Sequence, residues 1–551
     1  MPKVSSILVE QLKKKGCEYV FGIPGKPIVP LILEMESQGI KFSLARHECG
    51  AGYIATGYAL QNETIGVALG TSGPGGTNLI TAAAQAKAYH APVLFITGHP
   101  PLTMAGKALG QDSSMFGTDL TELFKPVTNF SAKVEDGRTL KNYLEHAFQK
   151  ALTGAKGPVH LSIPLDVLLQ EIEPFELPLH ELEDKVISGN IVPAVTMLNQ
   201  AVRPVMLLGK GAHISGAYEE VQKLAELWSI PVITTPGGKG VFPTNHPLSL
   251  GSFGLGGTEA AAGYLKDGTD VMLVIGSKLS DMSTTGLQEP FFPEKIIQFD
   301  YNPEFVGKSL PIETLFVQGD AKINLQKIIA DERAEHREIT VDLSSYWQAE
   351  QETRRAVREL SPAVQRLSAA HVMESLRSML PQETLVYGDD GSHTFYGIKH
   401  FDVIEPGTFF FDDVFGAMGH AIGFAIGAKL SKPEKTVVCL TGDGCMFMHG
   451  PEISTAVNEQ ANVIFIVLNN GMLDMVDKGM LYNLGRSVGT RYETELDAAR
   501  FAGSLGADSY RCTNMDEIAQ AAASALANKN GPSVIEIIVQ KDEIPPTMQR
   551  G

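Results

Sequence analysis

The stretch Val437–Asn470, VVCLTGDGCMFMHGPEISTAVNEQANVIFIVLNN, decides the fold of its part of the chain. It begins with an apolar strand that ends at Gly442-Asp443-Gly444, and an amphipathic helical segment follows. A second apolar strand, Val463–Leu468, leads into Asn469 and Asn470. Strand, helix and strand in this order predict a parallel βαβ unit, in which both strands end at the same edge of one sheet.

This edge has the chemistry of a cation and phosphate site. The glycines beside Asp443 let backbone amides approach a bound group, and the following helix points its positive end at the same place. Asp443 and Asn470 offer oxygen ligands that suit Mg2+ when a phosphate supplies others. Either sequence alone is an ordinary turn, so the prediction depends on both occurring after apolar strands.

Length and composition limit the class of protein. A chain of 551 residues is too long for one hydrophobic core, and domains of roughly 100–200 residues predict three or four of them. The net charge of -18 argues against a nucleic-acid partner. No apolar run approaches the roughly twenty residues of a membrane span, and the N-terminus lacks the apolar core of a signal peptide. Five cysteines without metal-type spacing fit reduced thiols, so we expect a cytoplasmic protein.

Strand-like and helix-like segments alternate along the whole chain, which predicts an α/β fold with parallel sheets. We expect three doubly wound parallel-sheet domains, at 1–175, 186–340 and 362–551. The first linker is the acidic, proline-containing Glu171–Asp184, and the charged Asp331–Arg358 forms a solvated helix and connection. The long aperiodic segment His99–Thr121 is predicted to be a functional loop. The predicted strands are Tyr19–Phe21, Phe42–Leu44, Ile65–Leu69, Val93–Thr97, Val159–Ile163, Pro204–Leu208, Pro231–Thr234, Val271–Ile275, Lys295–Phe299, Thr384–Tyr387, Thr408–Phe411, Thr436–Leu440, Val463–Leu468 and Ser533–Ile538.

Several motifs together resemble one enzyme family. The Gly-Asp-Gly to Asn-Asn stretch resembles the diphosphate-binding motif of thiamine diphosphate (ThDP) enzymes. Arg46-His47-Glu48 and the Gly/Ala-rich segment after it resemble the part that carries the glutamate facing the aminopyrimidine ring. Residues 209–254 resemble the central domain of acetohydroxyacid synthases. The resemblance, to the acetolactate synthase / pyruvate oxidase family and its acetohydroxyacid synthase large subunits, covers nearly all of the chain.

The resemblance implies three domains that bind the pyrimidine, occupy the centre and bind the diphosphate. It implies that Glu48 shares a proton with the ring nitrogen N1′ and that Gln111 approaches the reacting carbon. Asp443, Asn470 and the backbone oxygen of Met472 would bind Mg2+. The implied cofactor contacts are Pro24, Gly25, Thr71, Pro74, Asn78, Gly391, Ser392, His393, Gly416, Met418, Gly442, Asp443, Gly444, Cys445, Asn470 and Met475.

Each of these residues also has an ordinary interpretation from the local sequence. Glu48 is favourably placed at a helix N-terminus whatever its function. The glycines and hydroxyls of Thr71–Asn78 are also typical of a phosphate-binding loop. A histidine in a loop, such as His393, is usually on the surface, and a methionine such as Met418 more often fills a gap in a core.

The implied reaction is ThDP- and Mg2+-dependent decarboxylation of a 2-keto acid, with pyruvate as donor, and C–C bond formation to a carbonyl acceptor, giving a 2-hydroxyketone as an acetolactate synthase does. Phe116, Met475 and Val476 are candidates for the substrate pocket. Alternatives are a non-ligating decarboxylase, an aldehyde lyase, a specialised condensing enzyme, or a non-catalytic nucleotide-binding regulatory protein. Lys278 and Met282 stand where FAD-binding relatives have arginine, so FAD is an alternative and not the expectation. The resemblance implies a homodimer or homotetramer with active sites between chains.

Overall fold

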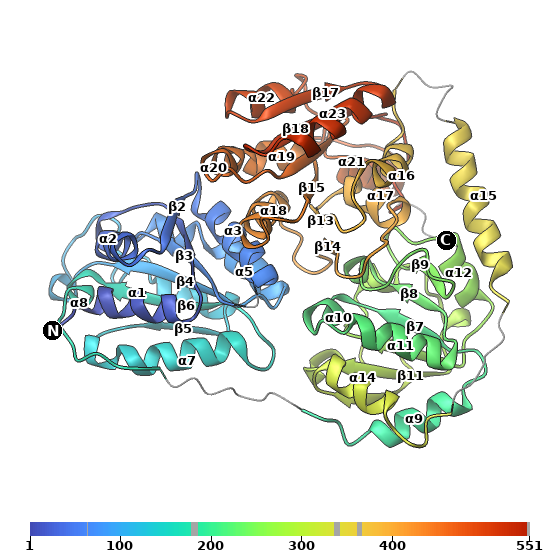
Figure 1. Cartoon of the computed structure of the whole chain (residues 1–551), viewed down its shortest axis with the longest axis horizontal. Helices are drawn as coiled ribbons and strands as arrows, with labels where there is room; N and C mark the ends of the chain where they lie inside the picture. The colour runs from blue at the N-terminus through green and yellow to red at the C-terminus, as the bar shows by residue number, and fades with distance from the viewer. Residues whose placement is uncertain (63, 178–185, 336–341, 361–365, 548–551) are drawn as a thin grey trace.

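The computed structural model describes residues 1–62, 64–177, 186–335, 342–360 and 366–547. It contains three six-stranded sheets whose neighbouring strands pair in parallel, with helices on their faces (Figure 1). This confirms the predicted α/β fold of three doubly wound sheets. The domain boundaries stay a proposal. The predicted domain ends at 340 and 551, the predicted start at 362 and the linker end at Asp184 lie outside the described residues.

The N-terminal sheet has the strand order β2-β1-β3-β4-β6-β5. The strand order reverses between β1 and β3, which makes this the topological switch point of the sheet. The segments after these two strands therefore face each other across a crevice. The strands are β1 Tyr19–Gly22, β2 Lys41–Leu44, β3 Gly66–Gly70, β4 Val93–His99, β5 Phe130–Lys133 and β6 Val159–Pro164. The helices are α1 Val4–Lys14, α2 Val29–Gln38, α3 Glu48–Asn62, α4 Pro74–Thr77, α5 Ile80–Ala88, α6 Leu120–Phe124, α7 Leu140–Leu152 and α8 Leu165–Leu168.

The central sheet has the order β12-β11-β10-β7-β8-β9, and the strand order reverses between β10 and β7. This is the order of dinucleotide-binding folds, in which ligands bind at this topological switch point. The strands are β7 Val205–Leu208, β8 Val232–Thr234, β9 Ser249–Ser252, β10 Val271–Ile275, β11 Lys295–Asp300 and β12 Glu313–Gln318. The helices are α9 Ile191–Gln200, α10 Lys210–Ile214, α11 Tyr218–Trp228, α12 Glu259–Lys266, α13 Asp281–Thr284 and α14 Ala321–Ile329.

The C-terminal sheet has the order β14-β13-β15-β16-β18-β17, which repeats the order of the N-terminal sheet. Its topological switch point, where the strand order reverses, lies between β13 and β15, and the Gly442-Asp443-Gly444 turn follows β15. The strands are β13 Leu385–Gly388, β14 Phe409–Phe411, β15 Val437–Gly442, β16 Ile464–Asn469, β17 Asp508–Cys512 and β18 Ser533–Ile538. The helices are α16 Ala369–Met379, α17 Ser392–His400, α18 His420–Ser431, α19 Asp443–His449, α20 Ile453–Asn458, α21 Asp474–Leu484, α22 Ala498–Ser504 and α23 Met515–Ala527.

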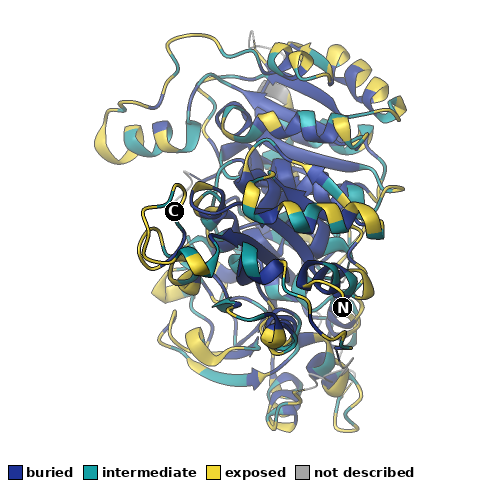
Figure 2. Cartoon of the chain, turned by 90° about the vertical axis from the view of Figure 1, so that its left-hand side faces the viewer, coloured by how far each residue is buried: buried dark blue, intermediate teal, exposed yellow. Residues whose placement is uncertain are grey.

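The predicted strands are all present, with ends shifted by one or two residues. Four further strands, β5, β9, β12 and β17, were not predicted, and each lies at an edge of its sheet. The inner strands are buried over nearly their whole length, as the dark strands of Figure 2 show, whereas most residues of β12 and β17 are partly or fully exposed. Edge strands lack the continuous apolar run that identifies a buried parallel strand.

The N-terminal and C-terminal sheets are joined by the packing of α3 against α18 (Figure 1). Their backbones approach closely, because a Cβ at Gly57 would lie 2.1 Å from the carbonyl oxygen of Phe424, and one at Gly427 would lie 2.0 Å from that of Ile54. One hydrophobic cluster runs through both domains, from Phe21 and Tyr53 to Phe424 and Val534. The two domains therefore share a core.

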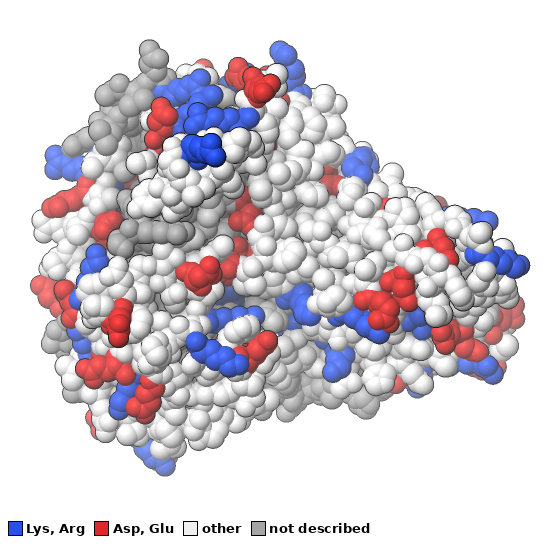
Figure 3. Space-filling model, turned by 180° about the vertical axis from the view of Figure 1, so that it is seen from behind, with Lys and Arg blue, Asp and Glu red and all other residues white. Residues whose placement is uncertain are grey.

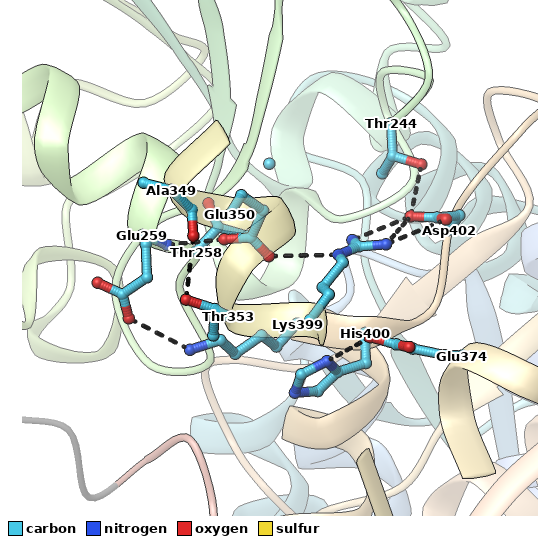
Figure 4. Close-up of polar contacts among 12 residues, drawn as sticks. Thr244, Thr258, Glu259, Ala349, Glu350, Thr353, Glu374, Lys399, His400 and Asp402 are labelled. Carbon is cyan, nitrogen blue, oxygen red and sulfur yellow. Dashed lines mark hydrogen bonds and ion pairs between the residues drawn. The ribbon is translucent and has the colours of Figure 1, made fainter. Parts of the chain in front are cut away.

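Helix α15 (Ser344–Leu360) runs between the central and C-terminal domains, as the charged stretch predicts. Its Arg354 lies 3.1 Å from Asp402 of the C-terminal domain and 3.3 Å from Glu350 of its own helix. Glu350 accepts a hydrogen bond of 2.9 Å from the backbone of Glu259 in the central domain (Figure 4). This network fixes the central domain to the C-terminal domain.

Candidate functional site

A cavity of about 230 Å³ opens at the carboxyl edge of the C-terminal sheet, where the segments after β13 and β15 face each other. The strand order reverses at this point, so the two segments diverge and leave room between them. Thirteen of the predicted site residues line it: Gly391, Ser392, His393, Gly416, Met418, Gly442, Asp443, Gly444, Cys445, Asn470, Met472, Met475 and Val476. Residues from four separate segments of the sequence are thus brought to one place.

Asp443 is the first residue of α19 and is 4% exposed. Its carboxylate accepts hydrogen bonds of 2.8 Å from the backbone amides of Gly444 and Gly471, so the turn after β16 is tied to the turn after β15. Burial raises the pKa of Asp443 to about 6, although the backbone amides around it act in the opposite direction. A cation bound here would favour the ionised form.

The two asparagines after β16 have different surroundings. Asn469 donates a hydrogen bond of 2.6 Å to buried Glu536 and faces away from the cavity into the core. Asn470 lines the cavity and donates 2.9 Å to Asp474, which leaves its amide oxygen for a ligand. Among the residues that the structure describes, no three His, Cys, Asp or Glu side chains form a metal cluster. An ion held by Asp443, Asn470 and a backbone oxygen would need further oxygens from a bound ligand.

Three buried polar atoms in the cavity wall have no hydrogen-bond partner within the protein: Asp390 Oδ2, Ser392 Oγ and His393 Nε2. Buried polar groups are normally satisfied, so these atoms fit a bound polar ligand. Burial lowers the pKa of His393 to about 4 and raises that of Asp390 to about 7. The hydroxyl, ring nitrogen and helix N-terminus at this position suit the diphosphate of ThDP.

The sequence did not single out Asp390, Leu473 or Glu543, which also line this cavity. Asp390 directly precedes the predicted Gly391-Ser392-His393 turn, so the end of β13 was the available signal. Glu543 lies after the last strand, and its carboxylate accepts hydrogen bonds from Ser368 and from the first amides of α16. Nothing local in the sequence indicates that position.

Glu48 and its neighbours form a second cluster in the N-terminal domain. Glu48 begins α3, is 7% exposed, and accepts a hydrogen bond of 2.9 Å from Asn78. Thr71 lies against Gly25 and Gly75, and its buried hydroxyl has no partner within the protein. Pro24 and Pro74 belong to the same two segments, after β1 and β3. The cluster therefore lies at the topological switch point of the N-terminal sheet, between β1 and β3.

Gln111 lies over this cluster, because a Cβ at Gly73 would be 3.0 Å from its Cα. Gln111 has a φ of 55°, a left-handed conformation that is uncommon outside glycine and often marks a functional position. Phe116, further along the same loop, is 65% exposed.

Within the described residues of one chain, the cavity beside Asp443 does not extend to the Glu48 cluster. The cavity beside Asp443 is lined by residues from 369 onward, and Pro24, Gly25, Glu48, Thr71, Pro74, Asn78, Gln111 and Phe116 are not among them. The structure therefore assembles two separate halves of the predicted site.

A larger cavity of about 690 Å³ lies at the topological switch point of the central sheet, between β10 and β7. Lys278 and Met282 both line it, and the ammonium of Lys278 lies 5.3 Å from the ring centre of Phe305. Its volume and position suit a nucleotide. Met282 offers no charge to a phosphate.

Comparisons with known proteins agree with this arrangement. Residues 2–121, 191–328 and 389–537 match the N-terminal TPP-binding, central and C-terminal TPP-binding domains of thiamine pyrophosphate enzymes. The chain is 30% identical to a probable acetolactate synthase large subunit of Methanocaldococcus jannaschii, over 100% of this chain and 94% of that protein. It is 31% identical to the acetolactate synthase large subunit of Corynebacterium glutamicum (97% and 86% covered) and 30% identical to the isozyme 1 large subunit of Escherichia coli K12 (98% and 94%). The chain therefore belongs to the thiamine pyrophosphate enzymes, in the acetolactate synthase family.

Proposed function

We propose that this protein is a ThDP- and Mg2+-dependent enzyme that decarboxylates a 2-keto acid, with pyruvate as the donor, and joins the remaining two-carbon unit to a carbonyl acceptor, as an acetolactate synthase does. The observation that carries the proposal is the cavity where Asp443, Asn470, Met472, Ser392 and His393 converge. The full-length similarity to acetolactate synthases supports the choice of reaction.

The cavity residues would hold the cofactor by its charged end. Asp443, Asn470 and the backbone oxygen of Met472 would bind Mg2+, and Ser392 and His393 would satisfy their free polar atoms on phosphate oxygens. Met418 would support the cofactor from the side, since its methyl group lies near Gly444. Bound ThDP supplies the electron sink for decarboxylation.

Glu48 would hold the proton at the aminopyrimidine nitrogen N1′. Its burial excludes water, and the hydrogen bond from Asn78 fixes the orientation of its carboxylate. Gln111 would reach the reacting carbon, while Phe116, Met475 and Val476 would shape the acceptor pocket. We propose FAD only as an alternative occupant of the central cavity. Visible flavin absorbance in the purified protein would establish it.

The two halves of the site support an assembly of at least two chains. Glu48 and Asp443 must reach opposite ends of one cofactor, yet their surroundings are separate in one chain. A homodimer or homotetramer with the N-terminal half of one chain facing the C-terminal half of another satisfies both. Several relatives are named large subunits, so a small regulatory subunit is a further candidate partner.

The surface supports a small-molecule substrate over a nucleic acid. Acidic and basic side chains are interspersed over the face seen in Figure 3, broad areas carry no charge, and the net charge is -18. Among the described residues, no helix has the length and apolar character needed to cross a membrane. The five cysteines are free and buried, which supports the proposed cytoplasmic location.

The test is to supply pyruvate, alone and with a panel of ketoacids and aldehydes, and to identify products by NMR. The wild-type protein with ThDP and Mg2+ should release CO2 and form a 2-hydroxyketone. The Glu48→Gln variant should turn over at least about a hundred-fold more slowly, because it cannot hold the N1′ proton. Glu122→Gln, an exposed glutamate of the same domain, is the control.

Aldehyde as the sole product would favour the non-ligating decarboxylase, and products from another donor would favour a lyase or a specialised condensing enzyme. No turnover of any keto acid by a folded, ThDP-loaded protein would favour a non-catalytic binding protein. Equal turnover by Glu48→Gln and wild type would remove Glu48 from the mechanism.

A further inference from the structure

Glu452 is a buried carboxylate of the C-terminal domain that belongs to neither half of the proposed site. It ends the short 3-10 turn Gly450–Glu452, directly after α19, and is 1% exposed. Its Oε1 accepts hydrogen bonds from the backbone amides of Arg46 at 3.0 Å and His47 at 2.9 Å. These two amides immediately precede Glu48, so a residue more than 400 positions away holds the backbone at the catalytic carboxylate.

Further hydrogen bonds fix the geometry of the contact between Glu452 and the backbone before Glu48. Oε2 of Glu452 accepts from the Thr455 hydroxyl at 2.7 Å and from Arg46 N at 3.3 Å, so both oxygens are occupied. The Arg46 side chain adds a bond of 2.7 Å to Ser454. Gly50 allows the close approach, because a Cβ there would lie 2.2 Å from Glu452 Oε1. Burial raises the pKa of Glu452, and the amides of Arg46 and His47 oppose that rise.

Within its own domain, the start of α3 is held by packing against β1, β3 and α5 and by the hydrogen bond of 3.1 Å from the amide of Ala45 to the carbonyl of Gly22. The His47 ring accepts a hydrogen bond of 3.1 Å from the amide of Cys49, which caps the first turn locally. The Glu48 side chain accepts its hydrogen bond from Asn78. A carboxylate at the positive end of α3 also gains from the helix dipole. Glu452 thus adds a restraint from the C-terminal domain on the two backbone amides that directly precede Glu48.

We propose that Glu452 is a positioning residue for Glu48: it fixes the backbone on which the proton-holding carboxylate stands, without touching the cofactor. The inference rests on the function proposed above. Because Glu452 is outside the diphosphate cavity, its loss should impair proton transfer to the cofactor without weakening diphosphate binding. A residue that merely stabilises the domain contact would not produce this separation.

The experiment compares Glu452→Ala, Glu452→Gln and wild type in the full-length protein. Three quantities are measured: amide hydrogen exchange of residues 45–52 without cofactor, ThDP affinity in the presence of Mg2+, and the rate of C2-proton exchange in bound ThDP. Glu452→Ala should expose the Arg46 and His47 amides to exchange and leave ThDP affinity unchanged. C2-proton exchange should slow by about ten- to a hundred-fold, as a displaced catalytic group predicts.

Glu452→Gln keeps one acceptor oxygen and should give intermediate values, and it carries the test if Glu452→Ala does not fold. The matched control is Asp270→Asn, since Asp270 accepts the successive amides of Val202 and Arg203 in the central domain. Asp270→Asn should leave C2-proton exchange at the wild-type rate. The inference would be overturned if folded Glu452→Ala exchanged the C2 proton at the wild-type rate, or if it lost ThDP affinity in parallel. If Glu48→Gln exchanged the C2 proton at the wild-type rate, the proposed function would be overturned instead.

Discussion

At the scale of single residues, burial controls the ionisation of the carboxyl groups around the cofactor cavity. Burial raises the pKa of Asp390 from 3.8 to about 7, and nearby Asp389 and Asp412 add to the rise while His420 opposes it. Asp390 also has an oxygen without a partner inside the protein. The cofactor-free protein therefore holds Asp390 protonated at a pH where the unfolded chain has lost that proton.

The stability contributed by this group depends on pH with a definite sign. A carboxyl group whose folded pKa is raised stabilises the fold fully below about pH 4, and this contribution is lost as the pH rises to about 7. The melting temperature of cofactor-free wild type should therefore fall more between about pH 5 and about pH 8 than that of Asp390→Asn. Asp516→Asn, an exposed aspartate of α23, serves as control. Equal falls in wild type and Asp390→Asn would contradict the assignment.

Some residue positions could be predicted and others could not. The Gly-Asp-Gly turn and Asn470 follow apolar strands, so local pattern alone placed them at one sheet edge, and the structure lines one cavity with them. Asn469 and Asn470 look alike in the sequence, but only the fold directs Asn469 toward Glu536. Glu452 was missed because its partners are more than 400 residues away, and no local periodicity records such a pair.

At the scale of elements, the segment 412–419 between β14 and α18 is held from all three domains. The carboxylate of Asp412 accepts the amides of Val414, Phe415 and Gly416, which folds the segment that carries Met418. Lys210 of α10 donates to the same carboxylate at 2.7 Å, and Gln85 of α5 donates at 2.6 Å. Burial alone would raise the pKa of Asp412, but the Lys210 ammonium outweighs it and holds that pKa well below its usual range.

Removing the lysine should therefore leave an uncompensated buried charge. Lys210→Met should destabilise the protein by about 3–5 kcal/mol and weaken ThDP binding through the displaced segment. The double variant Lys210→Met/Asp412→Asn should regain part of the stability, because the lone charge is gone. Thermal unfolding and ThDP titration check both. Lys239→Met is the matched control, since Lys239 is also buried in the central domain and its pKa responds to Asp402, Arg354 and Glu350 instead of Asp412. An equal loss in Lys239→Met would contradict a specific effect of this segment.

The elements themselves were largely readable from the sequence, with one consistent exception. Apolar runs bounded by Gly or Pro identified every inner strand, since these are buried on both faces. The edge strands β5, β9, β12 and β17 were not identified, because strands such as DSYRC and ETLFVQ are half exposed and mix polar with apolar residues.

At the scale of the whole molecule, the separation of the two half-sites gives a test of assembly. If Glu48 of one chain serves Asp443 of another, chains carrying Glu48→Gln and chains carrying Asp443→Ala are each inactive alone. Mixed dimers would contain one site with both wild-type halves and one site with neither. Equal co-expression should therefore restore about a quarter of the wild-type activity, because half of the dimers are mixed and each has one working site.

Activity of the mixture is measured with pyruvate after confirming by mass spectrometry that both chains are present. Co-expression of Glu48→Gln with Glu48→Gln/Asp443→Ala is the control, since no pairing of those chains restores a complete site. An inactive mixture of the two single variants, with mixed dimers present, would show that each site is built within one chain.

The packing of α3 against α18 also affects how the chain is made. Residues 48–59 of α3 are buried in the finished molecule, and much of their cover comes from a helix that is synthesised after the whole central domain. At roughly 5–20 residues per second, α18 leaves the ribosome on the order of tens of seconds after α3. During that interval the glycine- and alanine-rich apolar face of α3 lacks its partner helix, so we expect the nascent N-terminal domain to be prone to aggregation and to benefit from a chaperone.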